Sequence, residues 1–140
     1  MFHERHSWLA RWLILFSLEA VKTLTEVFDA VNRSVGDSFD GPVDSVQTER
    51  AGGETALHIV AKWGDAEAIR VLVANGADIN KAGEDSNTPL HYAAMLGKLE
   101  AVRCLAQLGA VNSKDRYGNT PADLAEDHKD VHDFLKAHNF

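Results

Sequence analysis

The chain is 140 residues long, which suits one ordinary domain, and its 45% hydrophobic and 25% charged residues form a composition that folds. Its net charge of -7 repels phosphate backbones and anionic membrane surfaces, so bulk nucleic-acid binding is disfavoured. The single cysteine, Cys104, cannot form a disulfide within the chain, and we therefore expect a cytoplasmic protein.

The first apolar stretch covers residues 8–18. Its uninterrupted apolar run, residues 12–16, is only five residues long, and no A-x-A-like cleavage site follows it. A membrane span needs about 20 mostly apolar residues, which Arg11, Glu19 and Lys22 do not allow. The pattern predicts a soluble helix, with neither a signal peptide nor a membrane span.

Residues 36–52 are rich in Gly, Asp and Ser and lack helical periodicity. This composition predicts a long exposed loop, which is either a tolerated insertion or a loop that carries function.

Three similar segments follow, beginning at Thr55, Thr88 and Thr120. Their starts read TALHIVA, TPLHYAA and TPADLAE, and they are separated by 33 and 32 residues. A threonine before a helix can bond its free backbone N–H groups, and a proline at the next position suits the first helical turn. The period is typical of a turn followed by two short helices.

These segments resemble the ankyrin repeat family, whose signature T-P-L-H-x-A is followed by a Gly turn, a second apolar helix and a G-A-D ending. The resemblance implies an all-α repeat protein, a solenoid of stacked helix-turn-helix units with β-turn or hairpin loops. Departures occur at Ala56, where the family has Pro, and at Val60, where it has Ala. The matching positions, which the resemblance makes structural, are Thr55, Leu57, His58, Gly64, Thr88, Pro89, Leu90, His91, Gly97, Leu105, Thr120 and Pro121.

We interpret the chain as one domain with repeats at residues 53–83, 84–115 and 116–140. The last segment has Ala122 and Asp123 in place of Leu and His, and its polar outer side is typical of a C-terminal capping repeat. Residues 1–35 are interpreted as a divergent N-terminal helical cap, because residues 15–32 align with residues 96–112 through a shared LEAV sequence.

The alternative for this region is one uninterrupted helix over residues 7–34, because no Gly or Pro occurs before Gly36. The apolar side chains of residues 8–18 either cover the cap itself or dock onto a partner or a second copy.

No nucleophile-elbow, phosphate-loop, dinucleotide or paired-cysteine motif occurs. His58 and His91 occupy the signature position that is structural in the family. His128 and His132 have the i, i+4 spacing of metal ligands but no obvious third ligand. We therefore expect neither an enzyme nor a protein with a cofactor or metal.

The resemblance implies binding of another protein through a concave face, made of loop tips and exposed positions on the first helices. Exposed Trp, Tyr and Met are good interface anchors, and the surrounding carboxylates favour a basic partner. We expect a regulatory or adaptor subunit. One alternative is an inhibitor or immunity-type protein that neutralises a basic enzyme or toxin. Another is a structural homo-oligomer through residues 8–18. We expect a monomer or a weak homodimer that forms through residues 8–18. The expected partner-binding residues are Ile59, Lys62, Trp63, Glu84, Asp85, Tyr92, Met95, Leu96, Tyr117 and Asn119.

Overall fold

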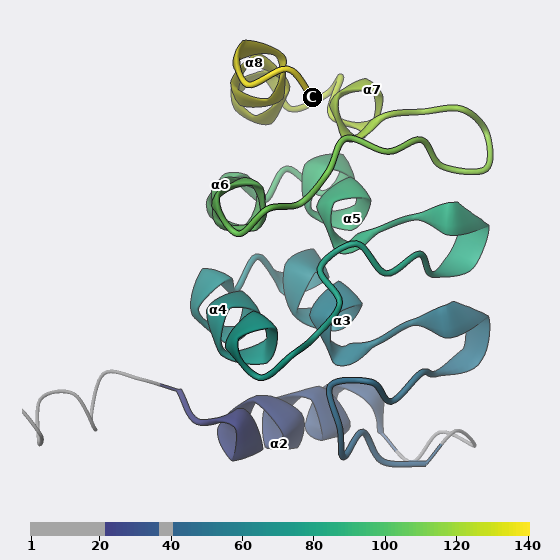
Figure 1. The fold of residues 1–140 in the computed structure, drawn as a ribbon, viewed down its shortest axis with the longest axis vertical. Helices are drawn as coiled ribbons and strands as arrows, with labels where there is room; N and C mark the ends of the chain where they lie inside the picture. Colours follow the sequence, from purple (N-terminus) through teal and green to yellow (C-terminus); the bar gives the residue numbers. More distant parts are fainter. Residues whose placement is uncertain (1–21, 37–40) are drawn as a thin grey trace, which may run out of the picture.

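A computed structural model describes residues 22–36 and 41–140, and the helices in these ranges form a stack (Figure 1). No strand occurs in these ranges, so the all-helical repeat architecture is confirmed. The elements are α2 (Leu24–Val35), η1 (Ala51–Gly53), α3 (Ala56–Trp63), α4 (Ala66–Ala74), η2 (Glu84–Ser86), α5 (Pro89–Met95), α6 (Leu99–Gln107), α7 (Pro121–Leu124) and α8 (Lys129–Ala137). The helices after α2 form pairs that lie above one another, and the loop before each pair projects to the same side.

The first helix of each pair, α3, α5 or α7, lies between the loops and the second helix; we call these three the inner helices and α4, α6 and α8 the outer helices. Each inner helix begins after a threonine with extended backbone. The threonine N–H donates to the side chain three residues later, which is His58 Nδ1 at 3.1 Å in α3 and His91 Nδ1 at 3.2 Å in α5. In α7 Asp123 accepts this bond at 2.9 Å, so an aspartate replaces the signature histidine.

The turns after α3 and α5 use glycine for two reasons. Gly64 and Gly97 have φ of 80° and 68°, which side chains with a Cβ rarely adopt. A Cβ on Gly64 would also lie 2.9 Å from Lys98, and a Cβ on Gly97 would lie 2.4 Å from His128. The next repeat therefore packs directly on each turn.

The core runs between the repeats, because α3 packs on α5 and α4 on α6. Leu57, Leu90 and Leu105 are at most 1% exposed. Small residues such as Ala61 and Ala94 are fully buried and let neighbouring helices approach closely. Each repeat thus depends on its neighbours for burial.

The helix α2 lies across the end of the stack, beneath both α3 and α4, and buries Val27 and Val31 (Figure 1). It begins after Thr23, whose extended backbone (φ -82°, ψ 158°) and capping box with Glu26 mark a true helix start. The alternative of one uninterrupted helix over residues 7–34 is therefore wrong. The LEAV alignment places Lys22 and Thr23 inside the second helix of a pair, whereas the structure places both residues before α2; the LEAV residues themselves, 18–21, lie outside the described residues. Residues 8–18 lie outside the described residues.

The prediction of a long exposed loop at residues 36–52 is wrong at two positions, Val43 and Val46, which are buried although the other described residues of the loop are exposed or half-buried. Val43 is 1% exposed and Val46 is 8% exposed. Asn32 of α2 holds the backbone of Val43 twice, donating to its carbonyl at 2.9 Å and accepting from its N–H at 2.7 Å. Gln47 donates to the carbonyl of Gly76 at 3.2 Å. The two valines are buried because they pack into the apolar core, where their side chains are removed from water.

At the other end, α8 buries Val131 and Leu135 and presents polar side chains outward, among them Lys129, Asp130 and Asp133. This polar face suits the end of a repeat array. Within residues 22–36 and 41–140, no helix combines the length and the apolar character that crossing a membrane requires.

Candidate protein-binding surface

Three loops of one design project past the inner helices. In each, the first residue donates its N–H to the carbonyl four residues later: Arg50 to Glu54 at 2.7 Å, Gly83 to Asn87 at 2.9 Å, and Asp115 to Asn119 at 2.9 Å. The second and third loops are also joined, because Arg116 N–H donates to the carbonyl of Asp85 at 2.7 Å. The tips therefore form a fixed row.

Two buried histidines tie the inner helices to these loops. His58 Nε2 donates to the carbonyls of Lys81 at 2.9 Å and Asn87 at 3.2 Å, and His91 Nε2 donates to the carbonyl of Asn119 at 3.2 Å. Burial lowers the pKa of both imidazoles below the ordinary 6.5, which keeps them neutral. Neither ring is free for catalysis or metal binding.

A lysine of α3 and a tyrosine of α5 contact each other across neighbouring repeats. The Lys62 ammonium is paired with the carboxylate of Glu54 and lies 4.4 Å from the centre of the Tyr92 ring. The same ring packs edge-on against His58, with centroids 5.8 Å apart. Burial raises the pKa of the Tyr92 phenol, and three nearby carboxylates raise it further. These carboxylates belong to Glu54, Glu84 and Asp85.

Large apolar side chains lie at the carboxyl ends of two inner helices. Trp63 ends α3 and is 40% exposed, while Met95 ends α5 and Leu96 follows it, and these two are 40% and 44% exposed. His128 Nε2 lies 3.2 Å from the carbonyl of Met95 and so limits this patch toward α8.

The loop tips carry acidic and aromatic groups. Tyr117 is 71% exposed, and its hydroxyl lies 3.4 Å from Asp85 Oδ1. The Arg116 guanidinium is 3.7 Å from the same oxygen. Glu84 is exposed and makes no ion pair with any residue that the structure describes. We use the name loop-side face for Lys62, Trp63, Glu84, Asp85, Tyr92, Met95, Leu96 and Tyr117.

A family model for ankyrin repeats (3 copies) matches residues 15–115 and again residues 57–140. The chain belongs to the ankyrin repeat family. No curated protein matches the chain. Ankyrin repeats generally mediate protein–protein interaction and are typically not enzymes. The match begins at residue 15, so it includes part of the region that the sequence suggests is a divergent cap.

Two of the residues expected at the ankyrin binding surface are engaged inside the protein. Ile59 is 5% exposed and belongs to the buried core, so the expectation that it is an exposed position is wrong. It shares its repeat offset with half-buried Tyr92, but a purely apolar side chain gains most from burial. Asn119 is half-buried, and its side-chain amide donates to Asp115 at 3.4 Å.

Asp115 is a residue that sequence reasoning missed. It is 8% exposed, and the backbone N–H groups of Tyr117 and Asn119 each donate to its Oδ1 at 2.9 Å. Burial opposes its ionisation, yet these hydrogen bonds prevail and lower the pKa of the carboxyl. An aspartate five residues before Thr120 in the DRYGNTP segment is the signal that could have shown it. The equivalent residue in the second loop is Gly83, and there Asn87 Oδ1 is buried without a partner.

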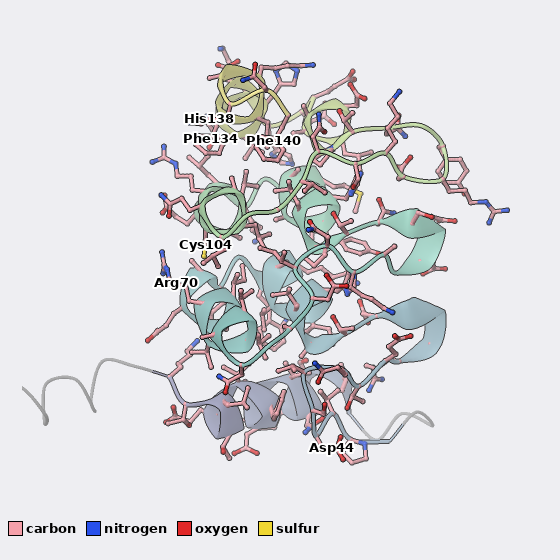
Figure 2. The ribbon with its side chains drawn as sticks, viewed as in Figure 1. Asp44, Arg70, Cys104, Phe134, His138 and Phe140 are labelled. Carbon is pink, nitrogen blue, oxygen red and sulfur yellow. The ribbon has the colours of Figure 1, made fainter. Side chains whose placement is uncertain are left out.

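The outer side of this ankyrin stack carries one cysteine, whose thiol is engaged inside the protein. Arg70 and Cys104 lie there, away from the loops (Figure 2). Cys104 Sγ is 3.5 Å from the carbonyl of Ala66, and burial raises the pKa of the thiol, which makes it a poor nucleophile. Near α8 the rings of Phe134 and His138 lie 4.2 Å apart.

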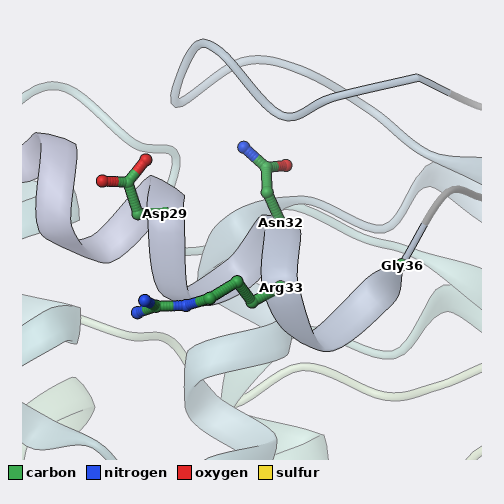
Figure 3. Close-up of a pocket in the computed structure, with 4 residues that line it drawn as sticks. All are labelled: Asp29, Asn32, Arg33 and Gly36. Atoms are coloured by element: carbon green, nitrogen blue, oxygen red, sulfur yellow. The ribbon is translucent and has the colours of Figure 1, made fainter.

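A cavity of about 500 Å³ adjoins α2 and is lined by Asp29, Asn32, Arg33 and Gly36 (Figure 3). It is wide open to solvent, and Asn32 is already bonded to Val43. Among residues 22–36 and 41–140, no three His, Cys, Asp or Glu side chains gather as metal ligands would. The loop-side face remains the candidate site.

Proposed function

We propose that this chain is a non-enzymatic ankyrin module that binds another protein through its loop-side face and acts as a regulatory or adaptor subunit. The observation that carries the proposal is the exposure of Trp63, Met95 and Leu96 at the ends of two adjacent inner helices. Aromatic and Met side chains dominate the energetics of protein interfaces. Here they are held on helices, so little ordering of the surface opposes binding.

A second candidate is an inhibitor that covers a basic enzyme or toxin. The net charge of -7 and the acidic loop tips favour this candidate, because opposite charges speed association and select partners. The two candidates use the same face and differ in what the bound protein does. An activity assay of the captured partner, with and without the chain, separates them.

Two leucines provide a matched test of the surface. Leu96 follows the inner helix α5 on the loop-side face and is 44% exposed, whereas Leu108 follows the outer helix α6 and is 39% exposed. We would capture proteins from the native lysate at low and high salt with four baits: wild type, Trp63→Ser/Leu96→Ser, Trp63→Ser alone and Leu108→Ser. Trp63→Ser is preferred to a change at Tyr92, because Tyr92 also contacts Lys62 and His58 inside the protein.

A protein retained by wild type and Leu108→Ser but lost by Trp63→Ser/Leu96→Ser supports the proposal. Equal retention by all baits, or loss with Leu108→Ser only, contradicts it. Recovery of nothing but the bait itself would instead point to self-association through residues 8–18, which sedimentation at several concentrations would measure.

A further inference from the structure

Charge is distributed unevenly along the loop-side face. Near the loop tips lie Glu54, Glu84 and Asp85; Lys62 is paired with Glu54, and Arg116 lies near Asp85. Lys62 neutralises Glu54, and Arg116 is 73% exposed with its guanidinium 3.7 Å from Asp85, which is a weak surface contact. Glu84 has no ion pair among the described residues. The tips therefore keep uncompensated negative charge.

The protein itself shows how this face holds a cation. The Lys62 ammonium lies over the Tyr92 ring and against the Glu54 carboxylate at once. An aromatic face combined with a carboxylate attracts a cation through both the ring quadrupole and the ion pair. At this position the chain's own lysine fills the place.

An aromatic ring and a carboxylate also lie together at the tips, where the cation beside them, Arg116, is 73% exposed. The ring of Tyr117 is 71% exposed beside Asp85, and Glu84 precedes Asp85 on the same loop. A guanidinium suits such a place better than an ammonium, because it stacks on aromatic rings and bonds carboxylates with two N–H groups. Asp85 and Ser86 also have φ of 54° and 62°, so this loop keeps polar side chains at positions that favour glycine.

The apolar patch and the acidic tips lie at opposite ends of the inner helices. The patch of Trp63, Met95 and Leu96 follows the helix ends, whereas the tips precede the helix starts. Seven residues of α5 at about 1.5 Å each place the two regions at least about 10 Å apart. A ligand that reaches both must carry its basic and apolar groups at that separation, which is about three residues of extended chain or seven of helix.

We propose that the partner of this face is a segment with an arginine that binds Glu84 and Asp85 beside Tyr117, and with apolar side chains that cover Trp63, Met95 and Leu96. This inference rests on the proposed function and defines the chemistry of the partner. The arginine is inferred from the negative charge of the loop tips, which a cation on the partner would complement. The apolar side chains are inferred from the exposed apolar patch, which a partner would cover.

The test uses a phage library of random peptides without charge bias, selected on the wild-type chain. Selected peptides are then measured against Glu84→Gln/Asp85→Asn, against Trp63→Ser/Leu96→Ser and against Asp29→Asn/Glu100→Gln. The last variant removes two carboxylate charges from exposed positions on α2 and α6 and so controls for overall charge. Asparagine tolerates the positive φ of position 85, and thermal midpoints check that all three variants fold.

The expected peptides contain arginine about three or seven residues from an apolar side chain. Their affinity falls at least about tenfold on Glu84→Gln/Asp85→Asn and stays unchanged on the control. Replacing the peptide arginine with neutral citrulline causes the same loss, and the two losses are not additive, because they remove one contact.

Peptides that require Trp63 and Leu96 but are indifferent to Glu84→Gln/Asp85→Asn would overturn the inference and leave the proposed function standing. An equal loss on the control variant would also overturn it, since the attraction would then be non-specific. If no selected peptide requires either region, the inference and the proposed function both fail.

Discussion

Replacing Leu90 with alanine tests whether the inner helices carry the core of the stack. Leu90 is 0% exposed in the middle repeat, where α5 packs on both α3 and α7. The change removes three buried carbons at about 0.8 kcal/mol each, or about 2.4 kcal/mol in all. The cavity left in a packed interior adds to this, so we expect a loss of about 3 to 4 kcal/mol. Such a loss is a large part of the stability of a domain this size.

Leu96→Ala is the matched control, because the same atoms are removed six residues later from a side chain that is 44% exposed. Water fills the space it leaves, so the expected loss is about 1 kcal/mol or less. Urea unfolding followed by circular dichroism gives both values, with the slope m as a check that the transition is unchanged. A cost below about 1 kcal/mol for Leu90→Ala, or equal costs for the two variants, would refute the assignment of inner-helix leucines to the core.

Three further predictions concern backbone geometry and pH. Gly97→Ala is expected to destabilise by at least about 1 kcal/mol through its positive φ, and His128→Ala should recover part of the loss because the new Cβ meets that ring; a double-mutant cycle of urea unfolding with purely additive effects would contradict this. Ser86→Gly should stabilise the chain by about 0.5 to 1 kcal/mol, since φ is 62° there, and an unchanged or lower thermal midpoint would count against it. His58 and His91 are neutral in the folded protein and gain a proton more readily when it unfolds. The free energy of unfolding is therefore highest above about pH 6.5 and decreases at lower pH, by at most about 1.4 kcal/mol per pH unit for each histidine. A urea midpoint that stays constant as the pH is lowered from about 7.5 to about 5.5 would contradict the lowered pKa values.

The repeat register could be predicted because its signals are local. Each inner helix begins directly after a threonine, which is Thr55, Thr88 or Thr120. The turns after α3 and α5 require the glycines at positions 64 and 97. Both effects involve a few neighbouring residues, so they are visible in the sequence.

The unpredicted features depend on what lies opposite in space. Ile59 and Tyr92 share one repeat offset, yet the first is buried and the second half-exposed. Val43 and Val46 look like loop residues until α2 and its Asn32 are placed against them. The start of α2 is set by the capping box that Thr23 forms with Glu26. In the sequence, the LEAV similarity suggests instead that the helix continues through Thr23.

Part of the candidate binding surface could be predicted from the sequence, because the family pattern marks the repeat positions that are exposed. Trp63, Met95 and Leu96 are exposed as expected. The contact of Lys62 with the Tyr92 ring joins neighbouring repeats and requires the packing of α3 on α5, which a single repeat does not reveal. The hydrogen bond from the Asn119 side-chain amide to the Asp115 carboxylate likewise depends on the folded loop, so the sequence alone does not reveal it.

Photo-crosslinking would show directly whether a partner binds the loop-side face. We would replace Leu96 or Leu108 with p-benzoylphenylalanine and irradiate each variant in the native lysate, because both side chains are similarly exposed but Leu96 follows the inner helix α5 and Leu108 follows the outer helix α6. We expect a crosslinked protein adduct from position 96 and none from position 108. An adduct from position 108 alone, or equal adducts from both positions, would contradict binding through the loop-side face.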